Sequence, residues 1–153
     1  MSGKPVVSLV MGSKSDEAAV KKSFEILDEF KVPYEFNIMS AHRTPNTVAR
    51  FARLAQGRGV KVIIAAAGLA AALPGVIAAH TTLPVIGIPM EAGPLRGNDA
   101  LYAIVQMPPG IPVATVGIGN AANAAYLALS ILALSDKKTD AQLKAFRKKY
   151  GDL

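Results

Sequence analysis

Residues 6–16 read VVSLVMGSKSD, an apolar run that ends in a glycine and continues into small polar residues. A second stretch of the same design, residues 34–45, reads YEFNIMSAHRTP. Each pattern predicts a β-strand followed by a turn and the start of a helix. Because the carboxyl ends of parallel strands meet at one edge of a sheet, we expect both turns at the edge where open α/β sheets bind their ligands.

Strand-like runs alternate with helical patterns along the whole chain. The predicted strands cover residues 6–11, 34–39, 61–67, 84–89 and 112–118. The predicted helices cover residues 15–30, a segment that begins at Pro45 and is closed by Gly57 and Gly59, and residues 74–80, 98–107, 120–134 and 138–150. Such alternation builds right-handed βαβ units. We therefore predict one α/β domain over residues 1–153, a three-layer flavodoxin-like parallel sheet with helices on both faces.

The 153-residue chain is 51% hydrophobic but only 6% aromatic, so Ala, Val, Ile and Leu supply most of its apolar mass. Such residues suit buried parallel strands that are covered by helices. The absence of cysteine excludes a disulfide framework and thiolate metal sites. The first five residues do not resemble the apolar core of a signal peptide, which favours a cytoplasmic protein.

Residues 62–79 contain no charged side chain and approach the roughly 20 apolar residues of a membrane span. Gly68, Pro74 and Gly75 interrupt this stretch. A buried strand, a tight loop and the start of a helix explain it better, and they continue the βα pattern found on both sides. We therefore expect no membrane partner.

The net charge of +6 favours anionic ligands without naming one. Basic residues cluster only near the C-terminus, at Lys144, Arg147, Lys148 and Lys149. A short basic helix without an aromatic stacking platform is usually a solvated face, so we expect no nucleic-acid partner. The last two predicted helices also carry apolar residues after one sheet is already covered. This surplus predicts that the segment around residues 138–150 packs on another subunit.

The first turn offers two interpretations that the sequence leaves open. In one, Gly12 lets a ligand approach the backbone closely, and the hydroxyls of Ser13 and Ser15 join the helix N–H groups in binding a phosphate. In the other, Ser15 only caps the helix and Asp16 only interacts favourably with the helix dipole. If the ligand carries a sugar, the Asp16 carboxylate can accept hydrogen bonds from ribose hydroxyls.

His42 is one of two histidines, and it lies on the second predicted turn, where exposure is expected. An imidazole titrates near neutral pH, so it can give and take a proton in one catalytic cycle. Arg43 follows it directly, and a planar guanidinium is well suited to binding phosphate. His80 stands at the end of an apolar helix, where we predict a helix C-terminal or packing residue. Since no His, Asp and Glu cluster has ligand spacing, we expect no metal site.

Four motifs together resemble those of the N(5)-carboxyaminoimidazole ribonucleotide mutase family. They are GSKSD at residues 12–16, SAHRTP at 40–45, LPG at 73–75 and QMPPGIPV at 106–113. The resemblance extends from about residue 6 to residue 134. It implies a cofactor-independent isomerase of purine biosynthesis that moves a carboxylate from the exocyclic nitrogen to carbon 4 of an aminoimidazole ribonucleotide. It also implies a homo-octamer.

By the same resemblance, His42 is the general acid and base. Ser13 and Arg43 are expected to hold the phosphate, and Asp16 the ribose hydroxyls. The base is expected to lie against Ser40 and Ala41, and Gly12 and Gly68 belong to the loops around the substrate. A closed pocket is required to retain carbon dioxide during the transfer.

The chain departs from the family in one loop. Residues 65–75 read AAAGLAAALPG where the family usually reads AGAGGAAHLPG. Ala66 and Leu69 therefore replace glycines, and Ala72 replaces a second histidine. Arg43, rather than a lysine, resembles the mutase class. The alternatives are a carboxylase that joins carbon dioxide to aminoimidazole ribonucleotide, and a protein that binds a ribonucleotide without catalysis.

Overall fold

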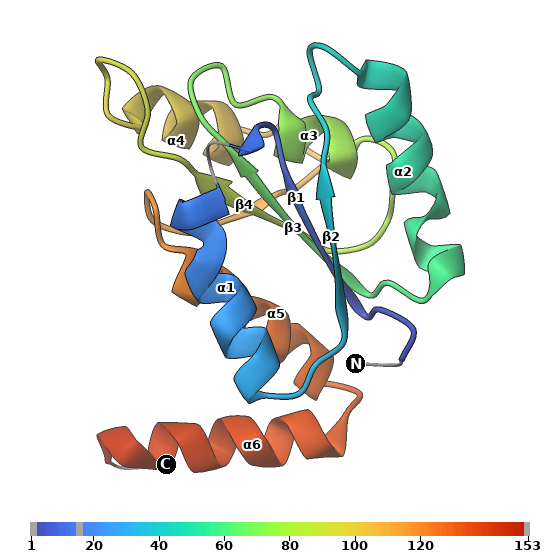
Figure 1. The fold of residues 1–153 in the computed structure, drawn as a ribbon, viewed down its shortest axis with the longest axis vertical. Coiled ribbons are helices and arrows are strands. Elements are labelled where there is room, and N and C mark those ends of the chain that lie inside the picture. The colour runs from blue at the N-terminus through green and yellow to red at the C-terminus, as the bar shows by residue number, and fades with distance from the viewer. Residues whose placement is uncertain (1–2, 15–16, 152–153) are drawn as a thin grey trace.

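The computed structural model describes residues 3–14 and 17–151. Within these residues, five strands form a single sheet in the order β2-β1-β3-β4-β5, and every pairing between neighbours is parallel (Figure 1). The strands are β1 (Val7–Met11), β2 (Tyr34–Ile38), β3 (Val62–Ala67), β4 (Val85–Pro89) and β5 (Ala114–Thr115). This order and direction confirm the predicted flavodoxin-like sheet.

Helices cover both faces of the sheet, as predicted (Figure 1). One face is covered by α1 (Glu17–Glu29) and α5 (Ala121–Ala133). The other face is covered by α2 (Pro45–Arg58), α3 (Leu73–Ala78) and α4 (Asn98–Val105). A further helix, α6 (Lys137–Arg147), runs across the end of α5 and continues into a 3₁₀ turn, η2 (Lys148–Tyr150).

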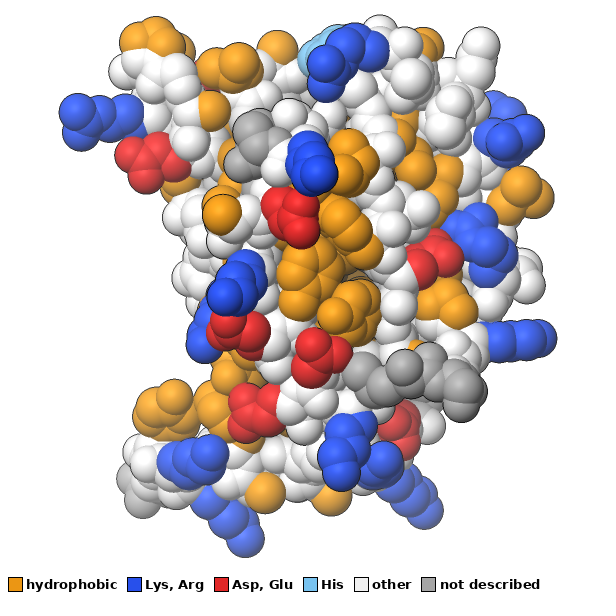
Figure 2. Space-filling view, in the orientation of Figure 1, with side chains coloured by type: hydrophobic (Ala, Val, Ile, Leu, Met, Phe, Trp, Pro, Cys, Tyr) orange, Lys and Arg blue, Asp and Glu red, His pale blue; other side chains and the backbone are white. Residues whose placement is uncertain are grey.

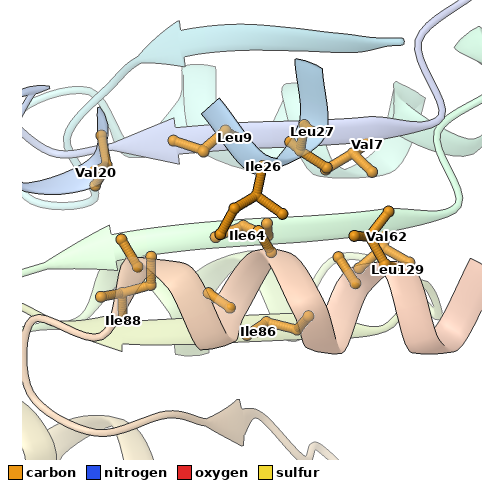
Figure 3. Close-up of a cluster of buried hydrophobic side chains, with 14 of the residues drawn as sticks. Val7, Leu9, Val20, Ile26, Leu27, Val62, Ile64, Ile86, Ile88 and Leu129 are labelled. Atoms are coloured by element: carbon orange, nitrogen blue, oxygen red, sulfur yellow. The ribbon is translucent and has the colours of Figure 1, made fainter. Parts of the chain in front are cut away.

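The central strands are largely apolar on both sides because each face of the sheet meets helices. In β1, Leu9 points toward α1 and α5, whereas its neighbour Val10 packs with α2 and α3 on the opposite face. Figure 3 shows the first of these layers, in which Leu129 of α5 lies beside Val62 of β3. Burying one such aliphatic side chain stabilises a fold by about 1.5–3 kcal/mol.

The uncharged stretch at residues 62–79 forms β3, a loop and α3, in agreement with the sequence interpretation. The helices in the described part of the chain are too short or too polar to cross a membrane.

The fifth strand is shorter than expected, since only Ala114–Thr115 pair with β4 instead of residues 112–118. Pro112 has no N–H group to donate to a ladder. Beyond Thr115 the chain still follows β4, because Val116 N donates to Gly87 O and Gly119 N donates to Pro89 O. Gly119 then adopts a left-handed φ of 68° and turns the chain into α5.

The C-terminal helix packs on its own chain. Leu143 of α6 is buried in the core beneath α5, and the ring of Phe146 stacks on Tyr126 with centroids 4.7 Å apart. Part of the apolar surplus noted in the sequence is therefore used within one chain. The packing of this segment on another subunit stays a prediction. The basic side chains of α6 and η2 are exposed, as expected of a solvated face.

Edge strand β2 carries aromatic side chains on the face that α1 covers. The ring of Phe24 in α1 stacks on Tyr34 and meets Phe36 edge-on, with centroids 5.5 and 5.2 Å away. Figure 2 shows apolar side chains gathered over α1 and β2, surrounded by charged ones. These rings attach the edge strand to the helix layer.

A polar cluster joins β1, β2 and α2. The hydroxyl of fully buried Ser8 donates to Glu35 Oε1 at 3.0 Å, and Arg58 Nη2 donates to the same oxygen at 2.8 Å. The guanidinium of Arg58 also lies 4.8 Å from the ring centroid of Phe51. Glu35 is thus the shared acceptor of one buried and one half-buried donor.

Replacing Glu35 with alanine removes that acceptor and leaves the Ser8 hydroxyl buried without a partner. We expect the free energy of unfolding in a urea titration to fall by about 1–3 kcal/mol. Glu25→Ala is the matched control, because it breaks only exposed helix pairs with Lys21 and Lys22 and should change stability far less. Equal losses in the two variants would contradict this account.

Asp136 caps α6 and makes its stability depend on pH. Its carboxylate accepts from Thr139 Oγ1 at 2.6 Å and from Lys138 N at 3.0 Å, and these bonds, the first above all, lower the pKa of Asp136. Since the folded pKa lies below the unfolded value of about 3.9, the stabilisation is complete above that value and is lost as pH falls through the folded pKa.

We expect Asp136→Asn, which retains a capping side chain, to weaken the acid dependence of unfolding in this window. Urea titrations from about pH 5 down to about pH 2 measure the slope, because the stabilisation is lost only below the unfolded value. An unchanged slope in the variant would show that the cap does not contribute.

Candidate functional site

A cavity of about 350 Å³ opens at the carboxyl edge of the sheet, among the turns drawn at the upper side of Figure 1. The C-terminal ends of four strands border this cavity. Its walls are Gly12 and Ser13 after β1, residues 40–43 after β2, residues 67–70, 72 and 73 around the exit of β3, and Ala92 after β4. This is the location at which open parallel sheets bind ligands.

The cavity brings together the residues that the sequence singled out, with one exception. Gly12, Ser13, Ser40, Ala41, His42, Arg43 and Gly68 all line it. Asp16 lies outside the described residues. The roles predicted for all eight side chains or backbone positions remain predictions at this point.

A direct hydrogen bond joins the first two turns. Arg43 Nη2 donates to the carbonyl oxygen of Gly12 at 3.1 Å, which holds the guanidinium across the mouth of the first turn. A Cβ atom at Gly12 would meet no atom within 4 Å, so the backbone there borders open space. The two turns therefore present a positive charge next to an accessible backbone.

The turn after β2 is closed by its own side chains. Arg43 N donates to Ser40 Oγ at 3.2 Å, and Ser40 N donates to Thr44 Oγ1 at 3.1 Å. Thr44 N and Thr44 Oγ1 both donate to the carbonyl oxygen of Ser40, at 2.8 and 3.0 Å. Ser40 thus shapes the turn as well as lining the cavity, and Thr44 is a supporting residue that the sequence interpretation did not identify.

His42 stands at the crown of this turn with an exposed side chain. Among the described residues, none donates to or accepts from its imidazole ring. Both ring nitrogens are consequently available to a bound molecule. An imidazole in this setting can exchange a proton with a ligand directly.

The third wall is built from small residues packed closely on the exit of β4. A Cβ atom at Gly68 would lie 3.2 Å from Ala92 Cβ and 3.4 Å from Met90 Cβ, so a glycine is favoured at this close approach. Ala71 N donates to Leu69 O at 2.8 Å and Ala72 N to Ala70 O at 2.7 Å, which makes the loop tight. Leu69 within it has a left-handed φ of 54°.

Ala72 lines the cavity directly before α3, at the position where the resemblance leads one to expect a second histidine. It contributes only a methyl group. His80 does not replace that histidine, because it follows the distal end of α3 and its Nδ1 lies 3.4 Å from Arg53 Nη2. This position agrees with the helix C-terminal alternative predicted for His80, since His80 N donates to Ile77 O.

The cavity offers hydroxyl, guanidinium and imidazole groups on one side and methyl groups on the other. That division suits a small anionic molecule with a flat apolar part. In the described part of the chain, no group of three or more His, Cys, Asp or Glu side chains is placed to hold a metal ion.

Ala92 was absent from the sequence interpretation, which named Leu69 only as a replacement for a family glycine. Ala92 had a signal, because it follows a predicted strand just as Ser13 and His42 do. For Leu69 the sequence contained no signal beyond the size of the side chain, since its left-handed conformation is a property of the folded loop.

Three comparisons with known proteins bear on this site. A family model described as AIR carboxylase matches residues 6–152. An N5-carboxyaminoimidazole ribonucleotide mutase from Pyrococcus abyssi is 52% identical over 145 residues, which are 95% of this chain and 83% of that protein. A phosphoribosylaminoimidazole carboxylase from Schizosaccharomyces pombe is 54% identical over 93% of this chain and 26% of its own length. The crystal structure of Treponema denticola PurE matches with a TM-score of 0.86 at 31% identity, over 95% of this chain and 91% of that chain.

We expect Arg43→Ala to weaken the binding of ribose 5-phosphate by about 10-fold to 100-fold, because a hydrogen bond to a charged group is worth about 1.5–3 kcal/mol. Isothermal titration calorimetry measures the affinity. Arg50→Ala is the control, since Arg50 is exposed on α2 and does not line the cavity. Equal weakening in both variants would assign the effect to net charge alone.

Proposed function

The chain belongs to the AIR carboxylase family, and we propose that it is the N5-carboxyaminoimidazole ribonucleotide mutase of purine biosynthesis. The observation that carries this function is the identity of about half of all residues with named mutases along nearly the whole chain. The reaction moves a carboxylate from the exocyclic nitrogen of the aminoimidazole ribonucleotide to carbon 4 of the ring. It is an isomerisation with no net oxidation or reduction.

In the proposed complex, the phosphate binds between Ser13 and Arg43. The hydrogen bond from Arg43 to Gly12 supports this role, because it keeps the guanidinium beside the first turn. A guanidinium and a hydroxyl are strong donors to phosphate oxygens. Asp16 accepts from the ribose hydroxyls, and the imidazole base lies along Ser40, Ala41 and Gly68.

His42 then serves as the acid and the base. It protonates the exocyclic nitrogen while the bond from that nitrogen to the carboxyl carbon breaks, and carbon dioxide leaves as a neutral molecule. Carbon 4 next attacks the carbon dioxide, and the ring loses its carbon 4 proton to the now neutral His42. One proton is given and one is taken, so the histidine returns to its starting state. The exposure of the ring supports both transfers.

The second candidate is a carboxylase acting on aminoimidazole ribonucleotide and carbon dioxide. The similarity to the fission-yeast carboxylase favours it, whereas Arg43 in place of lysine resembles the mutase class. Supplying both substrates in one assay decides between them. A mutase consumes the N-carboxylated substrate at low bicarbonate, and a carboxylase requires added carbon dioxide.

We also propose a cytoplasmic homo-octamer, in which the segment around residues 138–150 contacts another subunit. Large apolar side chains that remain exposed on the single chain support an assembly, among them Leu134 at 88% and Tyr102 at 60% of full exposure. Light scattering coupled to size-exclusion chromatography measures the number of subunits. A monomer at micromolar concentration would contradict the assembly.

Replacing His42 with asparagine is expected to lower kcat by about two to four orders of magnitude with little change in KM, because the ring moves protons but does not hold the phosphate. His80→Asn is the matched control and should leave kcat unchanged. If His42→Asn bound the nucleotide and the wild type showed no turnover, the chain would be a nucleotide-binding protein without catalysis. If the variant retained full activity, another group would be the acid and base.

A further inference from the structure

The loop between β3 and α3 contains one bulky side chain in an otherwise small-residue stretch. Residues 65–72 are all alanine or glycine except Leu69. Leu69 has φ 54°, in the left-handed region that disfavours every L-residue with a side chain. It is also 51% exposed. The fold therefore maintains an apolar side chain in an unfavourable conformation that leaves half of its surface in water.

The turn after β4 provides space for this leucine. A Cβ atom built on Gly93 would come within 2.7 Å of Leu69 Cδ2, so a side chain at this position would push the end of the leucine aside. Gly93 itself has φ 63°. The side chain of Leu69 thus lies across the gap between the β3 and β4 turns, on the same cavity that His42 and Ala92 line.

Strained residues that persist at a binding site are candidates for a role in that site. Leu69 donates no hydrogen bond through its side chain and carries no charge, so a role must come from its shape and its exclusion of water. Together with the methyl groups of Ala72 and Ala92, it forms the apolar side of the cavity. Such a surface holds a small uncharged molecule and disfavours water.

We propose that Leu69 is a positioning residue that caps the apolar side of the cavity and keeps released carbon dioxide beside carbon 4. This inference rests on the proposed mutase function. When the carbon–nitrogen bond breaks, its electron pair stays on the nitrogen, which takes the proton of His42, and the carboxylate carbon departs as neutral carbon dioxide. Recombination with carbon 4 then competes with escape into water. Leu69 favours recombination.

The test follows a labelled carboxylate. The N-carboxylated substrate carries ¹³C in the carboxylate, and the buffer contains unlabelled bicarbonate. Mass spectrometry measures the label in the carbon-carboxylated product, and chromatography measures any decarboxylated aminoimidazole ribonucleotide. The wild type is expected to retain the label. Leu69→Ala and Leu69→Gly are expected to release several-fold more decarboxylated nucleotide and to lose label to the same extent.

Three further variants separate this role from backbone strain. Lys31 has φ 55° at the end of α1, away from the cavity, so Lys31→Gly relieves the same kind of strain there. We expect Lys31→Gly and Leu69→Gly to raise the melting temperature, and Leu69→Ala not to raise it. Lys31→Gly should retain the label fully. Leu69→Met, which replaces the branched isobutyl group with an apolar chain of similar volume, should retain the label. Gly93→Ala should lower retention only when Leu69 is present.

Label retention in Leu69→Ala and Leu69→Gly equal to the wild type, with the wild type active, would overturn the cap and leave the mutase function standing. A slower rate with full retention would also overturn it, because that result assigns Leu69 a purely structural effect. A wild type that forms no carbon-carboxylated product would overturn the mutase function and the cap with it.

Discussion

Parallel pairing in register places Met11 of β1 opposite both Ile38 of β2 and Ala66 of β3. The three strands consequently end at the same level, and the turns that follow them lie side by side. The Arg43 to Gly12 hydrogen bond and the shared cavity are products of that alignment. A shift of one residue in β1 would turn its side chains to the opposite faces and separate the turns.

The cavity combines two kinds of local structure that the fold supports in different ways. The turn after β2 is stable by itself, because Ser40 and Thr44 close it with four hydrogen bonds to the backbone and to each other's groups. The loop after β3 is held from outside, since Gly68 and Leu69 pack against the exit of β4. The polar wall is therefore built from local sequence and the apolar wall from long-range contact.

That difference explains how far the sequence interpretation reached. The alternation of apolar runs and helical patterns was enough to predict the parallel sheet, and the polar residues after two strands predicted Ser13, His42 and Arg43 as neighbours. The predicted length of β5 was wrong. An edge strand forms hydrogen bonds with a single partner strand, so its extent depends on the positions of Pro112 and Gly119. The proximity of Leu69 to Gly93 could not be predicted from the sequence. The two residues lie on different loops, and the folded sheet brings these loops together.

The bond between Arg43 and Gly12 has a consequence for how tightly a ligand is held. A long side chain that is mobile in the empty protein loses rotamer freedom on binding, and that entropy is subtracted from affinity. Here one guanidinium nitrogen already donates to a carbonyl oxygen before any ligand arrives, which restricts the side chain. Part of the loss is thus incurred during folding rather than during capture, and the arginine is partly preorganised.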